Sequence, residues 1–283
     1  MRVAASPSFE LRRNFLCPHK AGKLSFGQLD FPSESEDCMK EQLYTIPVNE
    51  AFALDCECPV CAMHHKLKED ALDFTLGPSY MEDDIRMVTD KVGFCKEHVQ
   101  ELYNKQNRLG LALMLKTHAD KTIRDVSKLV KNYKPAKPSL FKKDTESNPL
   151  LSYLEEVEHS CFVCNKINNV FDRYIATIFF LYEKESDFRN TVDNCKGFCS
   201  EHYALLLREA PKQLSGKYVE DFTNALHKSY IKGMERVRDD LSWFIDKFDY
   251  RYTNEPWKNS KDSLQRMMMK QNSLEYFPDE GKK

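Results

Sequence analysis

Six of the ten cysteines and two of the eight histidines fall into a doubled pattern whose spacing suits metal binding. Each copy reads C-x2-C and then G-F-C-x2-H, with 33 residues between the second and third cysteines in the first copy and 34 in the second. The residues in chain order are Cys58, Cys61, Cys95 and His98, followed by Cys161, Cys164, Cys199 and His202. Cys thiolate and His imidazole are the usual ligands of Zn²⁺ in tetrahedral structural sites. The pattern therefore predicts two zinc ions.

The spacing also indicates how each pair of ligands is held. A C-x2-C pair places two sulfur atoms on one tight turn, and a C-x2-H pair at the start of a helix shares one face, because residues i and i+3 are neighbours there. A helix N-terminus favours the thiolate form. We expect the ligands to group within each copy, with Cys58, Cys61, Cys95 and His98 in half A and Cys161, Cys164, Cys199 and His202 in half B. Four protein ligands close a site, so both ions are expected to be structural.

Zinc ligation has three alternatives. Disulfides are disfavoured, because a disulfide framework needs no histidine and no export signal is visible. The cysteines could instead be ordinary buried side chains, or the Cys3His sets could hold an iron–sulfur cluster. Cys56 and Cys195 stand outside the pattern at positions that do not correspond between the copies. We interpret them as non-ligand cysteines, with alternative ligands or a pair of sensing thiols as the other options.

Composition narrows the class of protein. Hydrophobic residues make up 41% and charged residues 30%, as in a soluble globular protein, and only 9 glycines favour an all-α fold. The net charge of −2 argues against nucleic-acid binding. No apolar run approaches the 18 or more residues that span a bilayer, and no secretory signal is visible, so we expect a cytoplasmic protein without a membrane partner.

The chain divides into five segments, with an internal repeat of about 103 residues. We expect a duplicated helical domain with a pseudo-twofold arrangement, each half pinned by its own Cys3His site. Residues 1–38 are expected to be a disordered extension, with Met39 as the natural start. The other predicted segments are half A at 39–132, a linker at 133–149, half B at 150–250 and a C-terminal segment at 251–283.

Apolar periodicity and breaker residues predict the helices. We expect helical structure over residues 49–76, a short helix from Glu82 to Asp90, and a long helix from Lys96 that Asn107 and Gly110 weaken. In half B we expect residues 150–158 to lead into the second Cys pair, followed by helices at residues 171–182 and 219–248. The tail contains one further candidate helix, at residues 261–270.

Several of these segments resemble a known family. The residues that carry the resemblance are Met39–Val48, Cys58-Pro59-Val60-Cys61, Leu76-Gly77-Pro78-Ser79, the two Gly-Phe-Cys-x2-His segments and Asn254-Glu255-Pro256-Trp257. Over about residues 39–270 the chain resembles a bacterial family called domain of unknown function 6062. The resemblance implies a helical, cytoplasmic bacterial protein, and it implies no activity, substrate or partner.

Three functions compete on these observations. The first is a non-enzymatic, zinc-stabilised binding or regulatory module, with a protein partner or a homodimer left open. The second is a thiol redox protein or redox sensor that uses the C-x2-C pairs, and the third is an iron–sulfur protein. No nucleophile–base pair or phosphate loop supports an enzyme. Glu97 and Glu201 could serve as bases only if a metal ligand were labile.

Overall fold

The structure is a computed structural model that describes residues 34–133 and 148–274, and within these ranges it contains helices and no strands. This confirms the all-α prediction. The chain divides into Met1–Cys38 and Met39–Lys283, and the candidate site belongs to the second unit. The α-helices are α1 (Glu34–Ala53), α2 (Pro59–Leu76), α3 (Asp83–Val92), α4 (Lys96–Asn104), α5 (Arg108–Lys131), α6 (Pro149–His159), α7 (Phe162–Lys184), α8 (Ser186–Asn194), α9 (Ser200–Gln213), α10 (Lys217–Asp246) and α11 (Ser263–Asn272). Two short 3₁₀ helices are η1 (Pro78–Met81) and η2 (Tyr250–Tyr252).

The helix boundaries follow local chemistry. Residues 49–76, predicted to be helical throughout, are interrupted, because α1 ends at Ala53 and α2 begins at Pro59. Proline suits the first turn of a helix, where its missing N–H costs nothing. The weakness predicted in the helix after Lys96 is a true break: the Asn107 side chain accepts a hydrogen bond from the Gly110 N–H at 2.9 Å and caps the start of α5.

Residues 171–182 lie within a longer helix than predicted, because α7 already begins at Phe162, and the other expected helices appear with shifts of a few residues. The residue 219–248 run forms α10 and the tail helix is α11. The proposed linker lies mostly outside the described residues, as does the proposed N-terminal extension, although α1 already begins at Glu34. None of the helices in the described ranges combines the length and apolar composition needed to cross a membrane.

The buried apolar side chains form two cores, and each core draws on both halves of the repeat. Core 1 joins the end of α1 and the start of α2 to α8, α9, α10 and the later part of α7. Core 2 joins the end of α2, α4 and α5 to the start of α7. Each half therefore sends the beginning of its C-x2-C helix into the core of the other.

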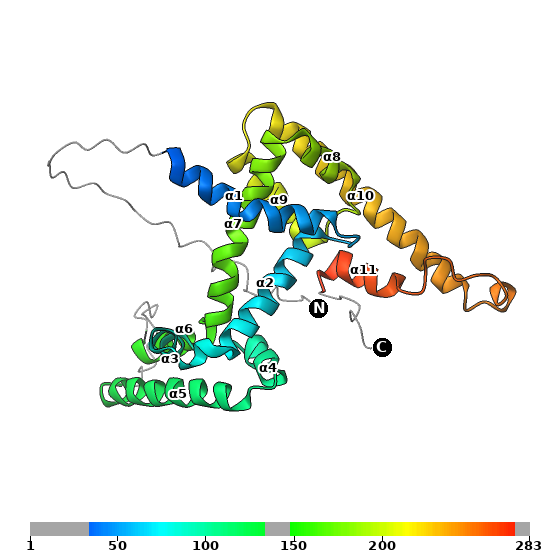
Figure 1. Ribbon diagram of the computed structural model, residues 1–283. Helices are drawn as coiled ribbons and strands as arrows, with labels where there is room; N and C mark the ends of the chain where they lie inside the picture. Colours follow the sequence, from blue (N-terminus) through cyan, green and yellow to red (C-terminus); the bar gives the residue numbers. More distant parts are fainter. Residues whose placement is uncertain (1–33, 134–147, 275–283) are drawn as a thin grey trace, which may run out of the picture. The chain divides into compact units, whose positions relative to one another are not determined.

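Helices α2 and α7 connect the two cores and lie side by side (Figure 1). The start of α2, at Cys61 and Met63, is in core 1 with Ile178 and Phe179 from the later part of α7. The end of α2, at Leu72, is in core 2 with residues from the first turns of α7. The two helices thus run antiparallel, and the first turn of each meets the far end of the other.

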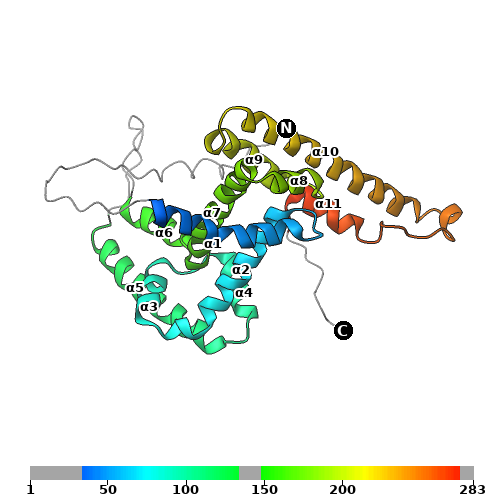
Figure 2. The ribbon, with the colours of Figure 1, turned by 45° about the horizontal axis from the view of Figure 1, so that its top comes forward.

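The long helix α10 closes core 1. It packs on α8, α9 and α11, and the last of these lies along it (Figure 2). Phe222 is fully buried, with ring centroids 5.1 Å from Phe179 and 4.9 Å from Tyr182 on α7. Aromatic pairs at this spacing add to the free energy gained from burial.

We expect Phe222→Ala to lower the free energy of unfolding by about 3–5 kcal/mol, because it leaves a cavity between α7 and α10. Chemical denaturation followed by circular dichroism measures this. Tyr250→Ala is the control, since Tyr250 is 86% exposed and its loss should change stability by less than about 0.5 kcal/mol. Equal effects of the two substitutions would contradict this description of the core.

Candidate metal centres

The structure gathers the eight predicted ligands into two groups of four. Centre 1 is Cys58, Cys61, Cys199 and His202, and centre 2 is Cys95, His98, Cys161 and Cys164. In each group one ligand atom from every residue lies within 4.8 Å of the others. The residues of the two copies thus come together, but the predicted grouping within each half is wrong. Each centre takes its C-x2-C pair from one half and its C-x2-H pair from the other.

The antiparallel packing of α2 and α7 explains the exchange. Helix α2 has 18 residues and is about 27 Å long. Cys58 and Cys61 lie at its start, whereas Cys95 packs against core 2, where α2 ends. The first turn of α7, with Cys161, is in that same core. The nearest C-x2-C pair for Cys95 is therefore the one from the other half.

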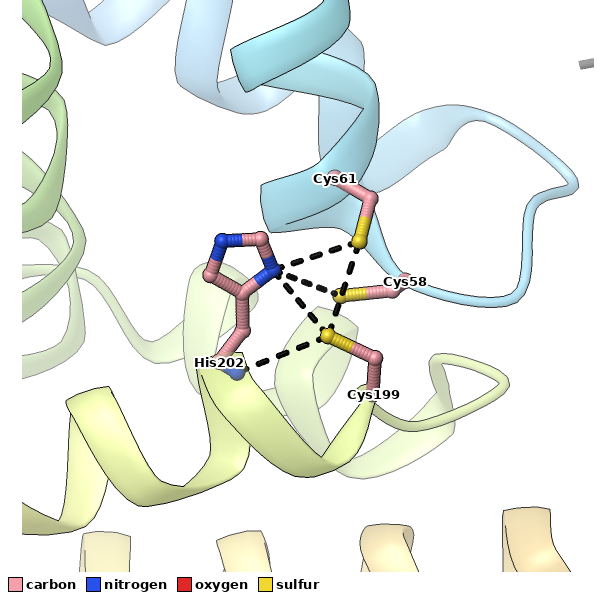
Figure 3. A group of neighbouring side chains, drawn as sticks. All are labelled: Cys58, Cys61, Cys199 and His202. Carbon is pink, nitrogen blue, oxygen red and sulfur yellow. Dashed lines mark hydrogen bonds between the residues drawn. The ribbon is translucent and has the colours of Figure 1, made fainter. Parts of the chain in front are cut away.

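The side chains of centre 1 converge on one point (Figure 3). The His202 Nδ1 atom lies 3.2 Å from the Sγ atoms of Cys61 and Cys199 and 3.6 Å from the Sγ atom of Cys58. The Sγ atoms of Cys61 and Cys199 are 3.5 Å apart. Cys58 and Cys199 immediately precede α2 and α9, and the Cys199 sulfur accepts a hydrogen bond from the His202 N–H in the first turn of α9 at 3.4 Å.

Centre 2 repeats this arrangement. The His98 Nδ1 atom lies 3.2 Å from the Sγ atoms of Cys95 and Cys164 and 3.5 Å from that of Cys161. The Sγ atoms of Cys95 and Cys164 are 3.9 Å apart. In both centres the histidine thus presents its Nδ1 atom to the sulfurs.

These distances match the edges of a coordination tetrahedron around a single ion. With Zn–S bonds of about 2.3 Å and Zn–N bonds of about 2.0–2.1 Å, the S···S edges are about 3.8 Å and the S···N edges about 3.5 Å. The distances given above, between 3.2 and 3.9 Å, scatter around these values. The ligand atoms of both centres are therefore close enough together to hold a single ion.

Protons are shared within the clusters. In centre 1 the hydrogen bonds from Cys58 and Cys61 lower the pKa of Cys199, while donation to Cys199 raises that of Cys61. Burial lowers the pKa of His202, but its hydrogen bonds to the Cys199 and Cys58 sulfurs outweigh burial and raise the pKa to about 10. In centre 2 the hydrogen bond from Cys164 lowers the pKa of Cys161 to about 3. A bound cation would replace these shared protons.

The surroundings of the two centres differ. All four ligands of centre 1 are buried, whereas Cys95 and Cys164 of centre 2 are partly exposed. The Glu101 carboxylate lies 4.0 Å from the His98 Nε2 atom and also pairs with Lys68 at 3.1 Å. At this distance the carboxylate is close to the imidazole but forms no hydrogen bond with it. Glu101 was not predicted from the sequence, although its position three residues after His98 is a recognisable signal. Centre 1 has Leu205 at the equivalent position.

Cys56 and Cys195, which stand outside the repeated pattern, belong to neither group of four. Burial raises the pKa of Cys56 and of Cys195 to about 11, and each precedes a ligand of centre 1. The Cys195 thiol donates a hydrogen bond to the Val192 carbonyl at 3.2 Å. Cys56 and Cys195, whose positions do not correspond in the repeat, thus lie beside the same centre, because each centre takes its two ligand pairs from different halves.

Metal content in paired serine variants tests the exchanged grouping. We expect Cys61→Ser with Cys199→Ser to abolish one ion per chain, because both residues belong to centre 1. Cys61→Ser with Cys95→Ser should abolish both ions, because it damages both centres. Elemental analysis of purified variants measures the difference. If the variant with Cys61→Ser and Cys95→Ser lost only one ion, the result would instead support grouping of the ligands within each half.

Comparison with known proteins places the chain in a family. No curated protein and no solved structure matches it. A family model described as a family of unknown function, DUF6062, matches residues 39–276, a range that includes all eight ligands. The chain belongs to the DUF6062 family.

Proposed function

We propose that this chain is a zinc-binding helical protein whose two ions are structural, and that it serves as a non-enzymatic binding or regulatory module. The observation that carries the proposal is the presence of two Cys3His groups with tetrahedral spacing, each joining both halves of the chain. An ion in either centre would tie α2 or α7 to the opposite half. Its binding energy would then contribute to folding.

A structural role is favoured over a catalytic one by the ligand number. Catalytic zinc usually has three protein ligands and an open position for water, whereas each centre offers four protein ligands. Glu97 and Glu201, the carboxylates between the Cys and His ligands, are exposed. Neither is in a position that suggests a base for metal-bound water.

A single ion is favoured over an iron–sulfur cluster by the ligand distances. A cluster contains several iron atoms and bridging sulfides, so its cysteine ligands stand further apart than ligands that share one ion. The S···S distances of 3.5 Å in centre 1 and 3.9 Å in centre 2 are those of a single ion.

Protein purified without added metal should contain two zinc ions per chain and be colourless. Removing the ions with a strong chelator should lower the unfolding temperature markedly, because structural zinc contributes on the order of ~10 kcal/mol per site in small zinc peptides. Elemental analysis, absorption spectroscopy and thermal unfolding measure these properties. Less than one ion per chain would refute the proposal, and visible charge-transfer bands would favour the iron–sulfur alternative.

A second candidate function, redox sensing, is favoured by one specific observation. Two thiols of centre 2, Cys95 and Cys164, are partly exposed with sulfurs 3.9 Å apart. Hydrogen peroxide could oxidise this pair: two thiolates, two protons and one peroxide molecule give one disulfide and two waters, and the ion loses two ligands.

If centre 2 is a sensor, peroxide should release one ion per chain and form a disulfide between Cys95 and Cys164, leaving centre 1 loaded. A chromogenic zinc indicator follows release, and peptide mass spectrometry identifies the disulfide. Cys95→Ser, which removes one sulfur of the pair, should form no such disulfide. A fully loaded protein that stays reduced in peroxide would exclude this function.

A further inference from the structure

The two ligand arms of centre 2 are hydrogen-bonded directly to each other. The C-x2-C arm is residues 160–164 and the G-F-C arm is residues 92–95. The Phe162 N–H donates to the Gly93 carbonyl at 3.0 Å, and the Ser160 hydroxyl donates to the Val92 carbonyl at 2.6 Å. These bonds tie the two arms directly to each other beside the ligands Cys161 and Cys95.

Neither bond can form in centre 1. In the repeat, Pro59 takes the place of Phe162, and Glu57 takes the place of Ser160. Proline has no N–H to donate. An ionised glutamate has no proton to donate either, and it would repel a facing carbonyl oxygen. The arms of centre 1, residues 57–61 and 196–199, therefore need another donor.

Lys270 of α11 supplies it. Its Nζ atom donates to the Glu57 carbonyl at 2.6 Å and to the Lys196 carbonyl at 2.8 Å, so it bridges the two arms. Lys196 corresponds in the repeat to Val92, which accepts the serine bond in centre 2. The third neighbour of Nζ is the Glu57 carboxylate at 3.3 Å. Three acceptors match the three donors of a lysine ammonium group.

The surrounding structure is built to accommodate this amine. The Lys270 side chain is 0% exposed, a costly position for a charge unless it is paired. A Cβ atom at Gly197 would lie 3.2 Å from Nζ, and one at Gly233 would lie 3.0 Å from it and overlap the Lys196 carbonyl oxygen. Gly233 thus leaves room for the amine and for the Lys196 carbonyl that it contacts, whereas a Cβ atom at Gly197 would first overlap the Ser229 carbonyl oxygen.

Helix α11 also contacts the C-x2-H helix of centre 1 directly. The Ser200 hydroxyl, in the first turn of α9, donates to the Lys270 carbonyl at 3.0 Å. Ser200 follows the ligand Cys199 in the chain. The residue that bridges the arms is therefore anchored at the same turn that presents the ligands.

We propose that Lys270 is the positioning residue of centre 1, and that it links the docking of α11 to occupancy of that centre. This inference rests on the proposed function, because it assigns a role to Lys270 at a centre proposed to hold zinc. Coupling between two such events is reciprocal. Loss of the lysine should weaken centre 1, and loss of the centre 1 ion should loosen α11. Centre 2, with its direct bonds, should respond to neither change.

The test compares Lys270→Met with Lys247→Met in the full chain. Lys247 is a matched control, because it is also buried and its Nζ atom donates to the carbonyls of Tyr252, Thr253 and Glu255 at 2.6–3.0 Å, away from the ligands. Alkylation by iodoacetamide, read peptide by peptide, reports the two centres separately. Lys270→Met should speed labelling of the centre 1 thiols at least tenfold and leave centre 2 unchanged, and Lys247→Met should do neither.

Two outcomes would overturn the inference: equal labelling of centre 1 in both variants, or equal acceleration at both centres in Lys270→Met. Labelling does not require an ion, so a wild-type protein without metal would refute the proposed function and leave this comparison valid. If Lys270→Met does not fold, hydrogen exchange in the serine variants decides. Exchange across residues 263–272 should rise in Cys199→Ser and stay at the wild-type level in Cys95→Ser, and equal exchange in the two variants would overturn the inference.

Discussion

The antiparallel contact between α2 and α7 is the constraint on which the rest of the structure depends. Each helix starts with a C-x2-C pair, and the contact carries that start to the far end of its partner. The cores, the ligand groups and the places of Cys56 and Cys195 all follow from this exchange. Parallel packing would have put both C-x2-C pairs at one end and left the C-x2-H pairs without partners at the other.

The exchange makes the two centres nested along the chain. Centre 2 joins residues 63 apart, at His98 and Cys161, and lies inside the loop of centre 1, which joins Cys61 and Cys199 138 residues apart. Once centre 2 is closed, the effective length of the loop that centre 1 must close falls to about half. Loop-closure entropy changes by about 0.6 kcal/mol for each factor of two in length, so the inner centre modestly favours the outer one. Grouping within each half would have produced two independent loops and no such coupling.

Local chemistry could be predicted from the sequence, and long-range grouping could not. The C-x2-C and C-x2-H spacings identified the residues that come together, periodicity located α10, and the weak helix formers Asn107 and Gly110 indicated the break before α5. The choice of partner was not predictable, because gaps of 33 and 34 residues do not indicate which way α2 and α7 face. The contact of Lys270 with centre 1 could not be predicted for a similar reason. Lys270 stands 213 residues from Glu57, in the C-terminal segment.

Comparison of equivalent positions in the two centres shows how one copy of a duplicated site can come to depend on a residue outside the repeat. In centre 2 the arms supply their own hydrogen bonds through Phe162 and Ser160, so the site is complete within the repeat. In centre 1 proline and glutamate remove both donors, and a residue from outside the repeat takes their place. A carbonyl pair left without a donor in this buried region would cost about 1–3 kcal/mol per group. The stability of centre 1 therefore also depends on the contacts that hold α11 in position, whereas the stability of centre 2 depends only on residues within the repeat.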